Sequence, residues 1–184
     1  DVIFGQNAST DTGSSLGDIK LGLAKTLVRE QGWRPDLIGR VTWDTDTGDR
    51  VDDDVVLGIG FHEFRGSLTA LKRQDPLAFT GTISYTTALE KDDIKPGDSL
   101  GLTLGASLAA SPSTSLSLAL SQVFQDEIEV DGRKIDGSDE NSSLLLFGAS
   151  TVVGPRTLLS LSAGVGLTDA APDYTVNLSL PMRF

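Results

Sequence analysis

Cysteine is absent from this chain of 184 residues, which excludes disulfide bonds, zinc–thiolate sites and thiol catalysis. Aromatic residues make up 6% of the chain and apolar residues 39%, so the sequence offers no obvious large interior. No run of 18 or more apolar residues occurs, which excludes a transmembrane helix. The start of the chain also lacks the charged-then-apolar pattern of a signal peptide, as expected for a mature or trimmed product.

Basic residues are few as well. Lys and Arg number 15 against 26 Asp and Glu, which gives a formal net charge of -11. Nucleic-acid binding depends on clustered Lys and Arg that neutralise phosphates. We therefore expect no nucleic-acid partner.

Alternation of apolar and small polar residues is the dominant pattern that remains. In "LGLTLGASLAA", Leu100, Leu102 and Leu104 alternate with Gly101 and Thr103. A period of two residues is typical of a β-strand. The same period recurs in segments of about ten residues. It predicts nine strands, near residues 16–28, 36–45, 55–72, 76–89, 98–110, 114–126, 142–153, 157–167 and 174–184.

Two of these segments are less regular. "SSLLLFGASTVV" is apolar on both faces at its start. The phase of the third segment changes near His62, which predicts a bulge or the end of a loop.

The connections between the strands are alternately short and long. Short, turn-rich links such as "KRQDP" and "ASPST" alternate with long acidic links such as "DTDTGDRVDDD" and "QDEIEVDGRKIDGSDENS". This alternation is typical of an up-and-down antiparallel sheet with tight turns at one end and large loops at the other.

The polar faces of the predicted strands decide between two fold classes. A soluble sandwich would bury the leucines and expose the Ser/Thr/Gly faces, but solvent faces of soluble strands usually carry Lys and Glu, and these faces are nearly uncharged. The pattern favours an all-β fold, a transmembrane up-and-down antiparallel β-barrel, with leucines toward lipid and small polar residues toward the lumen. We expect Leu102, Leu118, Leu161 and Leu178 to be exposed outside, and Thr103, Ser117, Ser160 and Asn177 to point inward.

The odd number of predicted strands indicates that at least one strand of the barrel is missing from the count. A bacterial barrel normally has an even number of strands, so at least ten are expected where nine are visible. Either residues 1–6 contribute the end of a tenth strand, or residues 1–184 are a single transmembrane barrel domain that forms the C-terminal part of a longer barrel. The last strand ends on Phe184, which resembles the terminal aromatic that barrel-insertion machinery recognises.

Charged residues within the predicted strands are candidates for the pore lining. A charge facing lipid costs about 2 to 4 kcal/mol at mid-depth, so an inward position is favoured. The inward candidates are Asp18, Lys20, Arg40, Asp44, Glu63, Arg65 and Arg183, and Lys25 is an exception that falls on the apolar face. These charges either brace the wall as ion pairs or set a field for passing ions or polypeptide.

Catalytic and metal-binding patterns are weak. His62 beside Glu63 suggests a membrane phospholipase only if a serine joins them, and no nucleophile motif marks one. "DGRKIDGSDE" lacks the ligand spacing and closing Glu of an EF-hand. We therefore expect a protein that is not an enzyme and has no metal site and no cofactor.

Several long stretches carry a family resemblance. "GDIKLGLAKTLVREQGWRPDLIGRVTWDTDTGD", "RGSLTALKRQDPLAFTGTISYTTAL" and "GDSLGLTLGASLAASPSTSLSLALSQVF" resemble the outer-membrane transporters of the phenol-degradation meta-pathway family. The resemblance implies a barrel of about twelve strands in the outer membrane, with an N-terminal plug and a helical trimerising region that this sequence does not contain. Its nearest functional branch exports functional-amyloid subunits.

Three functions follow from these observations. The first is a passive conduit that exports functional-amyloid subunits. The second is a pore for small aromatic or hydrophobic molecules, and the third is a non-conducting barrel that serves as a scaffold for a partner or surface assembly. The expected partners are membrane lipid, the barrel-insertion machinery and secreted amyloid subunits, with a homo-trimer formed through regions absent here.

Overall fold

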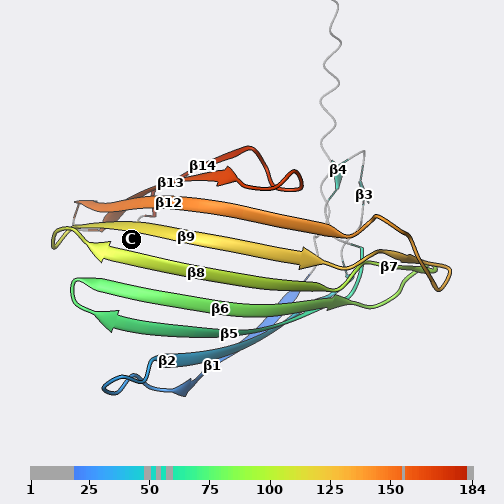
Figure 1. The fold of residues 1–184 in the computed structure, drawn as a ribbon, viewed down its shortest axis with the longest axis horizontal. Coiled ribbons are helices and arrows are strands. Elements are labelled where there is room, and N and C mark those ends of the chain that lie inside the picture. The colour runs from blue at the N-terminus through green and yellow to red at the C-terminus, as the bar shows by residue number, and fades with distance from the viewer. Residues whose placement is uncertain (1–18, 48–50, 53–54, 57–59, 155, 182–184) are drawn as a thin grey trace, which may run out of the picture.

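The computed structural model describes residues 19–47, 51–52, 55–56, 60–154 and 156–181, and the regular structure in these ranges is β-sheet (Figure 1). None of the described residues forms a helix long and apolar enough to cross a membrane. Nine strands form the main sheet: β1 (Lys20–Val28), β2 (Asp36–Asp44), β5 (Glu63–Gln74), β6 (Leu77–Ala88), β8 (Ser99–Ala109), β9 (Thr114–Gln125), β12 (Glu140–Gly154), β13 (Thr157–Gly166) and β14 (Tyr174–Ser179).

The strand order in this sheet follows the sequence. Each strand pairs antiparallel with the next, from β1 at one edge to β14 at the other. The predicted up-and-down antiparallel topology is therefore confirmed. Among the described residues β1 and β14 each pair on one side only, so the predicted closure into a barrel is not seen there.

The two ends of the sheet differ as the link lengths predict. β5 and β6 are joined through Asp75 and Pro76 alone, whereas the long links gather at the opposite end, on the right in Figure 1. Two small sheets lie in these long links. One contains β7 (Ile94–Lys95), β10 (Glu129–Val130) and β11 (Arg133–Lys134), and the other contains β3 (Val51–Asp52) and β4 (Val55–Val56). The end that carries the long links is called the loop end below.

The third strand corrects the sequence prediction. A strand over residues 55–72 is wrong at its start, because residues 55–56 pair with residues 51–52 and β5 begins only at Glu63. Gly60 has a φ of 74°, a left-handed conformation that interrupts an extended chain before β5. The phase change near His62 therefore marks the end of a loop.

The leucine face of the sheet is uncovered. The exposed fractions are 40% for Leu102, 46% for Leu118, 49% for Leu161 and 68% for Leu178. The buried apolar residues found in the described ranges are only Ala88 and Ala171. These leucines do not pack into an interior between two sheets, so the soluble-sandwich alternative is wrong.

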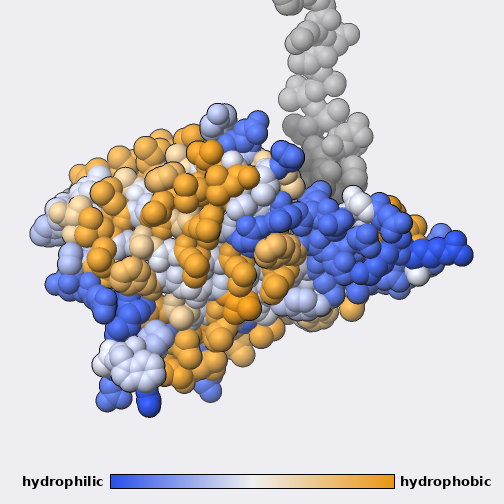
Figure 2. All heavy atoms as spheres, in the orientation of Figure 1, coloured by the Kyte–Doolittle hydropathy of each residue, from blue (hydrophilic) through white to orange (hydrophobic). Residues whose placement is uncertain are grey.

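The surface colouring agrees with this division. Figure 2 shows apolar residues spread over the strands and hydrophilic residues gathered at the loop end. On the leucine face near the loop end, Trp43 stacks on Phe64 with 5.9 Å between ring centroids. At the opposite end Trp33 is 83% exposed, with the Arg34 guanidinium 5.9 Å from its ring centroid. Aromatic girdles at both edges of an apolar band are typical of transmembrane barrels.

Candidate channel wall

The polar face of the sheet is lined by small hydroxyl residues that bond to one another. Directly paired residues lie on the same face, so Thr103, which pairs with Thr82 and Ser121, shares a face with Thr69. The Thr69 and Thr82 hydroxyl oxygens are 2.9 Å apart, and those of Ser115 and Ser150 are 2.8 Å apart. These short side chains therefore bond to one another across neighbouring strands of the wall.

Register places five of the predicted charged residues on this polar face. Asp44 pairs with both Lys20 and Glu63. On the same face, Arg65 lies one row of paired side chains farther from the loop end than Asp44, and Arg40 lies two rows farther. The Lys20 ammonium lies 2.5 Å from Asp44 Oδ2, and Asp44 is 5% exposed. Asp18, Arg183 and Phe184 lie outside the described residues. The pore-lining role of the seven charged residues stays a prediction, as does the role of Phe184 as an insertion signal.

A cavity of about 450 Å³ opens on the polar face around the two arginines. Its lining combines two guanidinium groups with hydroxyl side chains and one isoleucine: Ile38, Arg40, Thr42, Arg65, Ser67, Thr69 and Thr82. Sequence periodicity predicted that both arginines share a face with the hydroxyl residues, and the register agrees. Periodicity did not predict the cavity, because the lining comes from three strands whose relative register the sequence leaves open.

An apolar stretch interrupts the hydroxyl wall on β9 and β12. Leu144 pairs with Ser121 and Leu146 with Ala119, so both leucines lie on the polar face. Leu146 Cδ2 lies over Gly164 of β13, 2.9 Å from the point that a Cβ there would occupy. The predicted two-sided apolar character of this segment is confirmed. The wall therefore offers both hydrogen-bonding and apolar contact.

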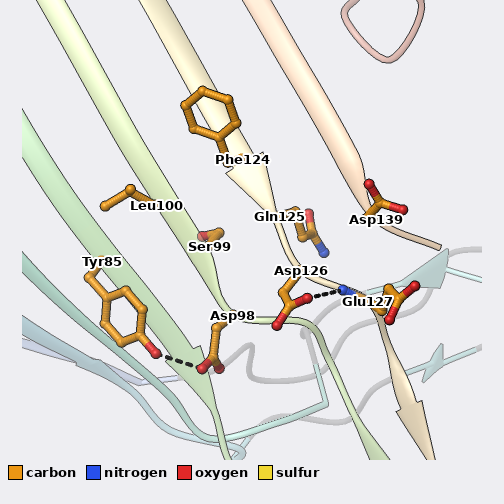
Figure 3. Close-up of a pocket in the computed structure, with 9 residues that line it drawn as sticks. All are labelled: Tyr85, Asp98, Ser99, Leu100, Phe124, Gln125, Asp126, Glu127 and Asp139. Carbon is orange, nitrogen blue, oxygen red and sulfur yellow. Dashed lines mark hydrogen bonds between the residues drawn. The ribbon is translucent and has the colours of Figure 1, made fainter. Parts of the chain in front are cut away.

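A second cavity, of about 610 Å³, lies at the loop end (Figure 3). The Tyr85 hydroxyl donates to Asp98 Oδ2 at 2.5 Å and the Thr87 hydroxyl to Asp98 Oδ1 at 2.7 Å. These two hydrogen bonds, with a smaller contribution from the Lys95 ammonium, hold the pKa of Asp98 below its usual value against the opposing effect of desolvation. The Lys134 ammonium lies 2.7 Å from Asp126 Oδ2 and is the main cause of the lowered pKa of Asp126.

The opposite end of the sheet carries an ion-pair cluster. Glu30, in the link between β1 and β2, accepts from Lys72 at 2.6 Å and from Arg73 at 3.1 Å, and Arg73 also lies 2.8 Å from Asp36. The Lys72 hydrogen bond is the main reason that the pKa of Glu30 is lowered. This cluster ties the link between β1 and β2 to the end of β5.

The phospholipase alternative receives no support from the surroundings of His62. Its Nδ1 accepts the backbone N–H of Asp46 at 3.2 Å, and its ring lies 6.0 Å from that of Trp43. His62 thus joins two parts of a loop. No group of three or more His, Cys, Asp or Glu residues that could hold a metal ion occurs in the described part of the chain.

Comparison with known families identifies the chain over its whole length. Residues 1–184 match the family described as "Putative MetA-pathway of phenol degradation". The chain belongs to this family. Membership confirms the resemblance at the level of the family, and it does not single out the branch that exports functional-amyloid subunits.

A solved structure shares the fold. The crystal structure of an outer membrane channel from Pseudomonas putida F1 matches with a TM-score of 0.76 at 20% sequence identity. The match covers 91% of this chain and 66% of that channel, so the chain spans less than two thirds of the channel's length. At this identity the match shows the fold, an antiparallel all-β sheet like that of an outer membrane channel.

Proposed function

We propose that this chain forms part of an outer-membrane channel for small hydrophobic or aromatic molecules. The outer membrane is the location that the fold match supports, in agreement with the prediction from the sequence. The observation that carries the proposal is the two-faced sheet, with large apolar side chains exposed on one side and a wall of small residues on the other.

The exposure of the leucine face favours contact with lipid over contact with water. Leaving apolar surface in water costs roughly 25 cal/mol per Å². Water would therefore penalise a face on which Leu104, Val176 and Leu178 are 66%, 77% and 68% exposed. Hydrocarbon removes this penalty, and the same side chains then anchor the sheet in the bilayer.

A closed barrel is part of the proposal. Lipid cannot satisfy the backbone N–H and C=O groups along an unpaired strand edge. The open edges of β1 and β14 must therefore pair with strands outside the described residues. An even total of ten or about twelve strands would meet this requirement.

The chemistry of the wall supports a small-molecule pore over the other two hypotheses. Leu144 and Leu146 add apolar contact to a wall of hydroxyls, which suits a solute with an apolar body. The family description refers to phenol degradation, which favours aromatic solutes over amyloid subunits. Trimer formation and a plug rest on resemblance alone, and the scaffold role stays an alternative that would require a lumen filled with side chains.

Uptake of a hydrophobic probe tests the proposal. Cells that express the full-length protein are compared with cells that lack it, using the fluorescence of N-phenyl-1-naphthylamine as it enters past the outer membrane. We expect faster uptake with the protein, and a severalfold loss in a Leu144→Asn/Leu146→Asn variant, because amides on the wall replace apolar contact. A Leu144→Met/Leu146→Met variant is the matched control and should retain uptake.

Assembly is checked separately by the heat-modifiable band of the folded barrel on gels. Uptake equal to that of cells lacking the protein, with a normal amount of folded barrel, would contradict the proposal.

A further inference from the structure

Arg40 and Arg65 are neighbours of like charge on the polar face. Arg40 pairs with Ser67 of β5, and Arg65 lies two residues before Ser67 on the same strand, so the two arginines are diagonal neighbours. None of the ion pairs formed within the described residues involves either of them. In a chain with a net charge of -11, two adjacent arginines without a carboxylate partner in these ranges are unexpected.

The acidic residues nearest to them, Asp44 and Glu63, lie on the same face, closer to the loop end. Asp44 holds the Lys20 ammonium at 2.5 Å. Glu63 lies opposite Asp44 and Ala88, at the loop-end row of the sheet. Along the polar face, the carboxylates of Asp44 and Glu63 lie at the loop end, and the arginines lie in the next two rows of paired side chains away from it.

Both arginines line one cavity, and the guanidinium group of Arg65 is hydrogen-bonded at its wall. Arg65 Nη2 lies 3.4 Å from the hydroxyl of Ser84, which is 7% exposed. Both arginines line the cavity of about 450 Å³ together with hydroxyl groups and Ile38. Repulsion between the guanidinium groups is offset when an anion lies between them.

We propose that Arg40 and Arg65 bind the carboxylate group of a small organic anion in the channel. A guanidinium group presents paired N–H donors that match the two oxygens of a carboxylate, and hydroxyls of Thr42 and Ser67 complete the donor set. Ile38 contacts the apolar body of the solute. The proposal rests on the proposed function, and it narrows the solute class to aromatic or short aliphatic carboxylates.

Binding of benzoate to the purified full-length protein in detergent is the direct test. Isothermal titration compares benzoate with benzamide and benzylamine, which have the same ring and a neutral or cationic head group. We expect benzoate to bind at least about tenfold more tightly than either. Equal binding of benzamide would overturn the proposal, since the arginine charges would then play no part.

Substitutions locate the site. Arg40→Gln and Arg65→Gln should each weaken benzoate binding by at least about tenfold, and the Lys variants should fall between, because an ammonium keeps the charge but loses the paired donors. Arg133→Gln, in the exposed β11 strand of the loops, is the matched control and should leave binding unchanged. Unchanged binding in both wall variants would refute the site.

Two further outcomes are distinguished. Displacement of benzoate by an equal concentration of inorganic phosphate would mean a general anion site and would overturn the carboxylate assignment. If the Gln variants fail to fold, the comparison of head groups on the unaltered protein still decides. Probe uptake without benzoate binding would refute this site alone, whereas benzoate binding without probe uptake would refute the proposed function alone.

Discussion

Asp98 shows how a single loop carboxylate supports the loop end of the sheet. It accepts hydrogen bonds from Tyr85 and Thr87 on β6 while it precedes β8, so it links two neighbouring strands where they leave the sheet. Hydrogen bonds to an ionised acceptor are stronger than those to a neutral one. This link therefore depends on the charge of Asp98.

The stability that Asp98 contributes should depend on pH. Because its pKa is lower in the folded state, its contribution is complete above the pKa of an unfolded Asp, about 3.9, and is lost as pH falls through the folded pKa. We expect Asp98→Asn to lower the unfolding temperature at pH 7, with a difference from the wild type that disappears in strongly acidic solution. Thermal unfolding in detergent, followed by circular dichroism, measures this.

The control for this prediction is Asp136→Asn, at an exposed loop position. It should leave the unfolding temperature unchanged at either pH. A pH-independent effect of Asp98→Asn would contradict the role assigned to the charge.

At the scale of the element, β9 shows both faces of the wall in consecutive residues. Leu118 pairs with Ala106 and Phe147 on the leucine face, whereas Ser117 pairs with Ser107 and Gly148 on the polar face. Successive side chains of a strand point to opposite sides, so these neighbours should meet different solvents.

Spin labels can report this difference because the chain contains no cysteine of its own. Oxygen, which concentrates in lipid, should strongly increase the relaxation rate of a spin label on Leu118→Cys. A water-soluble nickel chelate should strongly increase the relaxation rate of a label on Ser117→Cys. Electron paramagnetic resonance of the protein in liposomes measures both, and the reverse pattern would refute the assignment of the faces.

At the scale of the whole molecule, a prediction from the sequence concerns assembly in the outer membrane. Phe184 lies outside the described residues, and its role as an insertion signal stays a prediction. Deletion of Phe184 should reduce the amount of heat-modifiable barrel in outer membranes several-fold while synthesis is unaffected. Phe184→Tyr keeps an aromatic terminus and should assemble normally, and an unchanged barrel yield after the deletion would contradict the signal role.

The lengths and faces of most strands could be predicted from sequence because both follow from a local period of two residues. Leu102 and Thr103 differ in environment for this reason alone. The hairpin between β10 and β11 also had a local signal, since Asp131 and Gly132 both adopt positive φ, 51° and 71°, as an Asp-Gly turn favours. The acidic composition of that loop concealed this signal.

The cavity of the wall required the tertiary structure. Periodicity predicted that Arg40 and Arg65 point inward, but their adjacency depends on the pairing of Arg40 with Ser67, which links residues 27 positions apart in the chain. The same is true of the ion pairs of Glu30 with Lys72 and Arg73. Register between strands is decided by many cross-strand contacts at once, so no single segment contains it.

The sequence by itself therefore determined that this protein is an antiparallel β-sheet with one apolar face and one face of small polar residues. The reason is that alternate residues of a strand point to opposite faces of the sheet. Only the tertiary structure decided where β5 begins and which side chains meet on the wall. The physical reason is that strand pairing joins distant segments, and the free energy of that pairing is shared across the whole sheet.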